Sequence, residues 1–240
     1  MGHGWEGAVL KLMRAKDYMF TVTGSERINA HFRRVRFTDG GMLKATGVHP
    51  TMWVRVWFAN AGRPHQRGYT LVDADPEAGT FALDFAMHEG PACEWAEKAE
   101  PGDTIAATVQ GSAFTAPDPL PPRMFVFGDA AALPAINSLL AALPEVPATI
   151  WFETVADDGA DAETLALDPE RHELKLVPRK GSGGGLVAEA REALPGLIAD
   201  PASSYAWVAC EFASTRGLKT LLRKEIGMPK HRVNAMAYWR

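Results

Sequence analysis

The sequence predicts two domains, an antiparallel β-barrel followed by an α/β domain built on a parallel sheet. The first part of the chain carries short runs rich in Val, Phe, Trp and Thr between Gly, Pro, Asn and Asp residues, a pattern typical of strands and turns. The last part alternates strand-like with helix-like runs, which favours a parallel sheet with helices on both faces. Between them, Thr115–Pro122 holds four prolines in eight residues, which suit neither a helix nor an inner strand. We therefore expect the domains to span residues 1–120 and 121–240.

The first domain is expected to contain six strands and one helix. A closed barrel suits strands this short because closure leaves no exposed strand edge. The strands are expected at Tyr18–Thr23, His31–Phe37, Met52–Phe58, Gly68–Val72, Thr80–Met87 and Thr104–Val109, and the helix at Ala92–Ala99.

The second domain is expected to alternate strands with helices. Its strands are expected at Arg123–Gly128, Thr149–Thr154, Glu173–Val177, Tyr205–Cys210 and Val233–Trp239. Its helices are expected at Ala132–Leu143, Asp161–Leu167, Leu186–Leu194 and Ser214–Ile226, the second of them short and acidic. Such sheets bind ligands at the carboxyl ends of their strands, so residues at those ends are the candidates for a site.

Composition argues against several classes of protein. With 240 residues, 47% apolar and 22% charged, the chain has ordinary soluble globular composition, and its net charge of −4 argues against non-specific nucleic-acid binding. No apolar stretch approaches the ~20 residues of a membrane span and the first residues lack a signal pattern, so we expect a cytoplasmic protein with no membrane partner. The two cysteines are far apart and the histidines show no metal-binding spacing, so neither a disulfide framework nor a metal site is expected.

Two short segments carry the chemistry of the first domain. Arg67-Gly68-Tyr69-Thr70 offers a guanidinium, which binds pyrophosphate through two parallel N–H bonds, beside a phenol and a hydroxyl. Tyr69 and Thr70 alternate across a strand, so one is expected to face the barrel and the other the ligand. The loop His88–Pro91 opens a helix whose first N–H groups suit a phosphate. These are the parts that hold a dinucleotide with an aromatic redox ring, namely a flavin.

The ends of two strands supply the candidates in the second domain. Gly128 and Asp129 follow a buried-looking strand and lead through Ala132 into a helix. This position and the small side chains suit a nucleotide phosphate at the helix start. Glu211 ends a later strand of the same sheet, so it is expected to face the same crevice.

Taken in order, these segments resemble the siderophore-interacting protein family, which are flavin-dependent ferric-siderophore reductases. The resemblance covers nearly the whole chain. Its motifs are Arg67–Thr70, His88–Cys93, Trp95-Ala96, Pro101–Asp103, Gly128-Asp129, Leu133–Ile136, Ala209–Glu211 and Tyr238–Arg240. The family fold resembles that of ferredoxin reductases, which implies an FAD-binding barrel followed by an α/β domain that binds a nicotinamide dinucleotide.

The resemblance also implies roles for individual residues. Arg67 would bind the FAD pyrophosphate, Tyr69 and Thr70 would line the isoalloxazine and ribityl chain, and Arg55 would face the siderophore. The other cofactor contacts that it implies in the barrel are Gly68, Asp84, Phe85, Met87, His88, Pro91, Ala92 and Cys93. Those in the second domain are Gly128, Asp129, Ala132, Glu211 and Trp239, and Arg240 is a second candidate for the siderophore.

Four residues depart from the family pattern. Cys93 stands in place of a serine, Ala130 and Ala131 in place of an acidic residue and a threonine, and Cys210 in place of a glycine. The glycine-proline loop is also one residue shorter than the usual form. These changes remove polar groups from the expected cofactor crevice, which leaves FAD binding plausible and weakens the expectation of efficient nicotinamide use. Judged from its surroundings in the sequence alone, Cys93 is interpreted as a small packing residue.

The implied function is electron transfer from NADPH or NADH through FAD to a ferric siderophore, which releases iron as Fe(II). Reduced ferredoxin is an alternative donor. A ferric siderophore is often anionic and the chain is net acidic, so local cations must attract it. The candidates are Arg33, Arg34, Arg36, Arg55 and Arg240, of which the first three also fit a charged, solvated strand face. Two alternatives stay open: a flavoreductase with another acceptor, and an FAD- or siderophore-binding protein with weak or lost nicotinamide activity.

The sequence does not decide between NADH and NADPH. Glu153 ends the second strand of the second domain, where an acid can bind a ribose 2′-hydroxyl and repel a 2′-phosphate. Arg179-Lys180, after the third strand, favours the phosphorylated dinucleotide instead.

Overall fold

The computed structural model describes residues 16–60, 63–109, 112–156, 158–180 and 184–240. The chain forms two compact units that divide between Phe114 and Thr115. The division falls at the start of the proline-rich stretch Thr115–Pro122, a few residues before the predicted boundary between 120 and 121.

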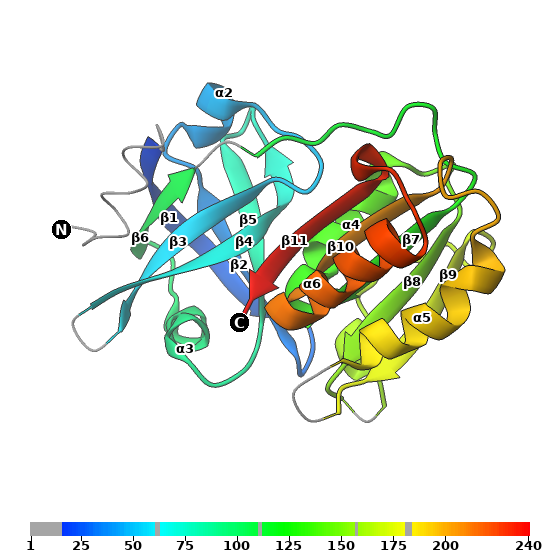
Figure 1. Cartoon of the computed structure of the whole chain (residues 1–240). Coiled ribbons are helices and arrows are strands. Elements are labelled where there is room, and N and C mark those ends of the chain that lie inside the picture. The colour runs from blue at the N-terminus through cyan, green and yellow to red at the C-terminus, as the bar shows by residue number, and fades with distance from the viewer. Residues whose placement is uncertain (1–15, 61–62, 110–111, 157, 181–183) are drawn as a thin grey trace. The chain divides into compact units, whose positions relative to one another are not determined.

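The first unit is a closed antiparallel barrel in the strand order β1-β2-β5-β4-β3-β6, with β6 pairing back onto β1 (Figure 1). All six predicted strands are present, and β1 and β4 extend well beyond their predicted bounds. The elements are β1 (Lys16–Arg27), β2 (Phe32–Thr38), α2 (Met42–Thr46), β3 (Trp53–Asn60), β4 (Arg63–Asp75), β5 (Thr80–Ala86), α3 (Pro91–Lys98) and β6 (Thr104–Val109). The sequence analysis missed the short helix α2.

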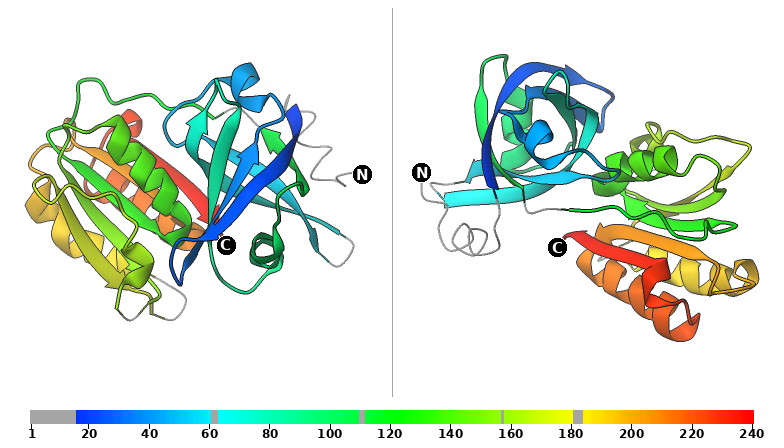
Figure 2. Two further views of the ribbon diagram at one scale, coloured as in Figure 1. Left: turned by 180° about the vertical axis from the view of Figure 1, so that it is seen from behind. Right: turned by 90° about the horizontal axis from the view of Figure 1, so that it is seen from above.

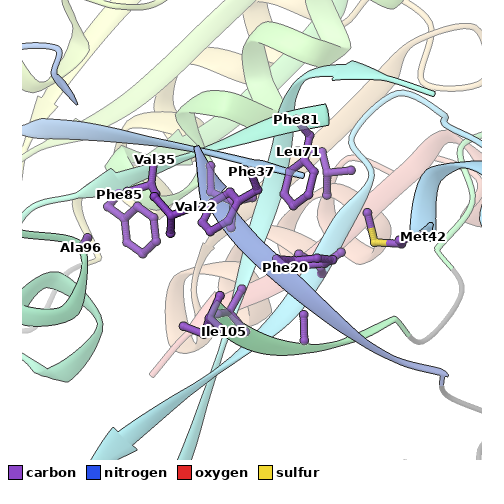
Figure 3. Close-up of a cluster of buried hydrophobic side chains, with 14 of the residues drawn as sticks. Phe20, Val22, Val35, Phe37, Met42, Leu71, Phe81, Phe85, Ala96 and Ile105 are labelled. Carbon is purple, nitrogen blue, oxygen red and sulfur yellow. The ribbon is translucent and has the colours of Figure 1, made fainter. Parts of the chain in front are cut away.

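Aromatic side chains fill the barrel (Figure 3). The ring of Phe81 lies 4.8 Å from that of Phe20 and 5.3 Å from that of Phe37, measured between centroids. Burying each such side chain contributes about 1.5–3 kcal/mol. From α3, Trp95 stacks on Phe37 with 6.3 Å between ring centroids and 6° between ring planes. This contact fixes α3, and with it the loop after β5, against the barrel.

The second unit is a five-stranded parallel sheet in the order β11-β10-β7-β8-β9. Helix α4 covers one face, and α5 and α6 cover the other (Figure 2). The main elements are β7 (Met124–Asp129), α4 (Leu133–Ala142), β8 (Ala148–Thr154), β9 (His172–Pro178), α5 (Gly185–Leu197), β10 (Tyr205–Glu211), α6 (Phe212–Thr220) and β11 (Val233–Trp239). Short helical turns are η1 (Ala130–Ala132), η2 (Ala160–Ala162), the π-helical η3 (Leu221–Glu225) and η4 (Lys230–Arg232). Parallel pairing aligns the carboxyl ends of all these strands along one edge.

The acidic helix predicted over Asp161–Leu167 is wrong, because only the single turn η2 forms there. Asp161 is 1% exposed, and its carboxylate accepts hydrogen bonds from the hydroxyl of Thr154 and from the N–H of Val155. The carboxylate therefore closes the end of β8 instead of lying on a solvated helix face. Side chains of Asp that bond nearby backbone compete with helix formation in this way.

The structure bears on three expectations from the sequence, which concern a membrane span, a metal site and the two cysteines. Within the described ranges, no helix combines the length and apolar character needed to cross a bilayer. In the same ranges, no three His, Cys, Asp or Glu side chains are grouped so as to hold a metal ion. Cys93 and Cys210 are both buried and unpaired with other cysteines.

Candidate functional site

Strands β3 and β4 hold the Arg67–Thr70 segment in a fixed register. Val54 pairs with Tyr69, and Arg55 pairs with Gly68. Tyr69 is the member of the Tyr69–Thr70 pair that faces the barrel, since its ring centroid lies 4.4 Å from that of Phe85. Burial, with a smaller effect of Cys93, raises the pKa of the Tyr69 phenol, so it remains a neutral hydrogen-bond donor.

The other face of the hairpin carries buried polar atoms for which the described part of the chain offers no hydrogen-bond partner. Thr70 is 5% exposed and its hydroxyl makes no hydrogen bond within the described residues, and the same holds for the indole N–H of Trp53. A Cβ on Gly68 would lie 3.5 Å from the Trp53 ring, so the glycine backbone passes close to this ring. The guanidinium carbon of Arg55 lies 4.8 Å from the centroid of the same ring. Buried polar atoms without partners are rare and costly, so a ligand that satisfied them would be stabilised here.

Arg67 is exposed at the end of this segment. Its guanidinium donates to the carbonyl of Gln66 at 3.0 Å. Among the described residues no carboxylate lies within ion-pair distance of it, so most of its donors are available for a pyrophosphate.

The loop between β5 and α3 is closed by a thiol. Sγ of Cys93 accepts from the N–H of His88 at 3.5 Å and donates to the carbonyl of Ala86 at 3.4 Å. Burial raises the pKa of this thiol, so it stays protonated. Gly90 adopts φ 143°, which L side chains rarely adopt, and Pro91 starts α3, whose N-terminus has no side-chain cap. The backbone N–H groups, rather than the thiol, are what this loop can offer to a phosphate.

The predicted site residues of β5 and of the segment after it divide between the barrel core and the outer face. Phe85 lies in the barrel core, and Met87 and Ala92 pack against the same core. Asp84 lies on the outer face, where Oδ1 and Oδ2 accept from Nε and Nη2 of Arg34 at 2.7 and 2.8 Å. This bidentate pair occupies both oxygens of Asp84.

The arginines of β2 are ion-paired. Arg33 and Glu97 are 3.9 Å apart, Arg34 also contacts Asp73 at 3.0 Å, and Arg36 donates to Glu26 at 2.7 Å. The structure thus agrees with the interpretation of this segment as a charged strand face. Arg55, which lies beside Trp53 on β3, remains a candidate for a substrate cation.

At the carboxyl edge of the parallel sheet, Gly128 allows α4 to approach β7. A Cβ at Gly128 would lie 2.7 Å from Cδ1 of Ile136, 3.2 Å from Cβ of Ala132 and 3.3 Å from the carbonyl oxygen of Ala209. Asp129 follows it and accepts from the N–H of Ala131 at 3.0 Å. The Asp129 carboxylate therefore takes up the Ala131 N–H, a donor that a phosphate could otherwise use at this helix start.

Asp129 is 6% exposed and also accepts from the indole Nε1 of Trp239 at 2.8 Å. Burial raises the pKa of Asp129 to about 6, and the hydrogen bonds from Trp239 and Ala131 only partly offset this effect.

Glu211 caps α6 in a similar way. Its carboxylate accepts from the N–H groups of Ala213 and Ser214 at 2.6 and 3.0 Å. Desolvation opposes ionisation, but these bonds outweigh it and lower the pKa of Glu211. The neighbouring Cys210 is buried against Thr215, and burial raises the pKa of its thiol to about 12.

Glu153 and Arg179 form an ion pair at the ends of β8 and β9. The guanidinium of Arg179 donates to Oε2 of Glu153 at 2.6 Å, and its Cζ lies 4.7 Å from the Trp239 ring centroid. Arg240 stacks separately on Phe212, with its Cζ 4.7 Å from the ring centroid. The edge of the sheet thus carries one connected group, Glu153–Arg179–Trp239–Asp129.

Comparison with known proteins identifies the family. Residues 121–240 match the model of the siderophore-interacting proteins, and residues 42–112 match the siderophore-interacting FAD-binding domain. The chain belongs to the siderophore-interacting protein family. FAD is accordingly the cofactor of its barrel. The exposed Arg67, the α3 N-terminus without a side-chain cap, and the Thr70 hydroxyl, which no described residue hydrogen-bonds, fit that cofactor.

Two curated relatives illustrate the range of this family. The chain is 35% identical over 249 residues to the mycobactin import ATP-binding/permease protein IrtA of Mycolicibacterium thermoresistibile, covering 100% of this chain and 26% of that protein. It is 31% identical over 184 residues to the ferric vibriobactin reductase ViuB of Vibrio cholerae, covering 74% of this chain and 65% of that one. The chain therefore spans about a quarter of the length of the first relative.

Solved structures support the fold. A siderophore-interacting protein from Acinetobacter baumannii aligns with a TM-score of 0.78 and 23% identity, over 94% of this chain and 91% of that one. A ferredoxin NADP⁺ reductase from Neisseria gonorrhoeae with bound FAD and NADP aligns with a TM-score of 0.62 and 14% identity, over 94% and 98%. The predicted ferredoxin-reductase-like architecture is confirmed.

Sequence reasoning missed two features of these sites. Trp53 was not singled out, although it alternates with Arg55 and Trp57 on one face of β3. That alternation was the available signal. The contact of Arg179 with both Glu153 and Trp239 has no local signal, because it joins three strands that are separated along the chain.

Proposed function

We propose that this siderophore-interacting protein is a flavin-dependent reductase that takes electrons from a nicotinamide dinucleotide and passes them to a ferric siderophore, releasing Fe(II). The observation that carries the proposal is the buried Thr70 hydroxyl, which has no hydrogen-bond partner among the described residues, on the same strand as the exposed Arg67 in an FAD-binding barrel. The relative named ferric vibriobactin reductase supports the same reaction class.

The barrel residues bind and orient the cofactor. Arg67 holds the pyrophosphate with its parallel donors, Thr70 offers its hydroxyl to the ring system, and the first N–H groups of α3 receive the remaining phosphate charge. The bound FAD supplies the ability to accept two electrons together and to release them singly. Tyr69, held against Phe85, keeps the strand in place from the barrel side.

The acceptor is recognised by charge and shape. Ferric siderophores hold Fe(III) through hard oxygen ligands and often carry negative charge, and such ligands bind Fe(II) much more weakly. Arg55 stacks on the Trp53 ring, which limits the conformations of its guanidinium. Together they present a cation beside an aromatic face, and we assign them to the siderophore.

The test is an anaerobic assay with the FAD-loaded protein, NADH or NADPH, a ferric siderophore and a chelator that reports Fe(II). We expect Fe(II) to form with at least one dinucleotide, and Arg55→Glu to raise the apparent KM for the siderophore with little effect on kcat. An unchanged KM in that variant would remove Arg55 from the substrate site. A panel of simple ferric chelates distinguishes a siderophore reductase from a flavoreductase with another acceptor.

A second candidate is an FAD- or siderophore-binding protein without nicotinamide activity. It is favoured by the carboxylates of Asp129 and Glu211, which occupy N–H groups at two helix starts where a dinucleotide phosphate would bind. Retained FAD that neither dinucleotide reduces would support this candidate. Reduced ferredoxin is then the next donor to test.

A further inference from the structure

The carboxyl edge of the parallel sheet carries an excess of acidic groups. Asp129 and Glu211 are the last residues of β7 and β10, Glu153 is the last but one of β8, and Arg179 follows β9. The acids influence one another, because Glu153 raises the pKa of Asp129 and Glu211 raises that of Glu153, although burial is the larger cause in both. A further anion placed here would therefore meet repulsion.

Arg179, a candidate ligand for a phosphate at this edge, is already engaged. Arg179 donates to Glu153 at 2.6 Å and lies with its guanidinium over the Trp239 ring. Its side chain is 19% exposed, so little of it faces solvent. Recognition of a 2′-phosphate needs a guanidinium whose paired donors are available, and this one would have to give up its bond to Glu153 first.

Glu153, in contrast, retains an unused acceptor. Its side chain is 1% exposed, and Oε1 accepts no hydrogen bond from any described residue. Glu153 lies near the end of β8, the second strand of this domain along the chain. At that position an acidic side chain can hydrogen-bond the adenosine ribose of a dinucleotide. A ribose hydroxyl would supply the missing donor to Oε1 while Oε2 keeps its bond from Arg179.

We propose that this siderophore-interacting protein selects NADH over NADPH, with Glu153 accepting the ribose 2′-hydroxyl and excluding a 2′-phosphate while it holds Arg179. The proposal rests on the proposed function, in that a nicotinamide dinucleotide is the donor. Of the opposing signals of Glu153 and Arg179, it favours the acid, because Arg179 is paired with Glu153.

The experiment measures binding and reduction separately. Calorimetric titration of the FAD-loaded protein with NAD⁺ and with NADP⁺ gives the ratio of dissociation constants without any turnover. Steady-state reduction with NADH and NADPH gives the ratio of kcat/KM. The variants are Glu153→Gln, which keeps the shape and removes the charge, and Arg179→Gln. The matched control is Glu145→Gln, which removes the same charge from an 84% exposed side chain in the loop after α4.

We expect the wild type to bind NAD⁺ at least about tenfold more tightly than NADP⁺, since an unpaired buried charge costs this much or more. Glu153→Gln should lower that preference about tenfold, mostly through KM, and Glu145→Gln should leave it unchanged. Arg179→Gln should keep the NAD⁺ preference, and this variant tests the proposal independently if Glu153→Gln does not fold.

A wild type that prefers NADP⁺, or an NAD⁺ preference that survives Glu153→Gln, would overturn the proposal. Loss of NADP⁺ binding in Arg179→Gln would do the same, since it would make Arg179 the 2′-phosphate ligand. If neither dinucleotide reduces FAD, the proposed function fails, but the binding ratio still decides the role of Glu153.

Discussion

The indole Nε1 of Trp239 donates to Oδ2 of Asp129 at 2.8 Å. This bond joins the end of β11 to the end of β7 past β10, which lies between them in the sheet. Arg179 stacks on the same indole and binds Glu153, so the ends of four strands share one polar network. The edge of the sheet where this fold class binds ligands is therefore held in a defined arrangement by its own side chains.

The first prediction concerns the buried carboxyl of Asp129. Its pKa is raised from 3.8 to about 6 in the folded protein, so the folded state binds this proton more tightly than the unfolded state does. Stability from this group is therefore fully present below pH ~4 and is lost as the pH rises through about 6, by at most about 3 kcal/mol. Asp129→Asn removes the charge but keeps only one acceptor oxygen, so its amide NH2 meets the donor of either Trp239 or Ala131. The lost hydrogen bond should lower the free energy of unfolding by about 1–2 kcal/mol at every pH, and the stability of the variant relative to the wild type should rise by up to about 3 kcal/mol between pH 4 and pH 8.

Denaturant unfolding of both proteins at a series of pH values checks this expectation. The difference between the two curves isolates Asp129 from other titrating groups. A relative stability of the variant that does not rise between pH 4 and pH 8 would show that the ionised carboxylate is favourable where it lies.

Arg67→Ala should weaken FAD binding by about 10–100-fold, the effect of losing charge-assisted hydrogen bonds to a pyrophosphate. Arg67→Lys should recover only part of the affinity, because an ammonium cannot form the parallel pair. Fluorescence titration of the apoprotein with FAD measures both. Arg36→Ala is the matched control, since Arg36 is a half-exposed arginine of the same barrel paired with Glu26. Equal losses in Arg67→Ala and Arg36→Ala would indicate a general charge effect instead of a pyrophosphate site.

Asp84→Ala should destabilise the barrel and leave FAD affinity unchanged. Its carboxylate is 8% exposed and bound through both oxygens by Arg34, so removal leaves a partly buried guanidinium without its main partner. We expect a loss of about 1–3 kcal/mol in the free energy of unfolding. Glu26→Ala, which breaks the exposed pair with Arg36, should cost less than about 1 kcal/mol. A selective loss of FAD affinity in Asp84→Ala would restore Asp84 to the cofactor site.

Gly128→Ala should cost about 1–3 kcal/mol because its Cβ would overlap Ile136 and press on Ala132. Ile136→Ala in the same chain should remove part of the additional cost, which a double-mutant cycle in denaturant would measure. Gly196→Ala, on a helix position with open space around it, is the control and should be neutral or slightly stabilising. Equal costs at both glycines would show that the close approach of α4 to β7 is not what requires Gly128.

Much of the fold could be predicted because its signals are local. The alternation of Phe81, Leu83 and Phe85 with small or polar neighbours marks an inner-barrel strand, and the fully buried run Met124–Asp129 marks a central parallel strand. The acidic helix failed because Asp161 bonds to the end of β8, which is a tertiary contact that composition does not reveal.

The candidate site also contains residues that a local motif reveals and pairings that only the strand topology reveals. The motif Arg67–Thr70 could be found because its residues are consecutive on one strand. Two pairings could not, since each joins strands whose adjacency depends on topology: Arg34 with Asp84 across β2 and β5, and Arg179 with Glu153 across β9 and β8. The resemblance assigns Asp84 to FAD and local position assigns Arg179 to a 2′-phosphate, whereas the structure pairs each of them with another side chain of the protein.

The most direct test of the central claim is a single-turnover experiment on the FAD-loaded protein under argon. NADH is added in equal amount and the visible flavin absorbance is followed, and a ferric siderophore is then added with an Fe(II)-specific chelator. The account predicts that NADH bleaches the flavin absorbance and that the siderophore restores it as Fe(II) appears. A flavin that stays oxidised with every dinucleotide, or one that the ferric siderophore reoxidises no faster than buffer does, would contradict it.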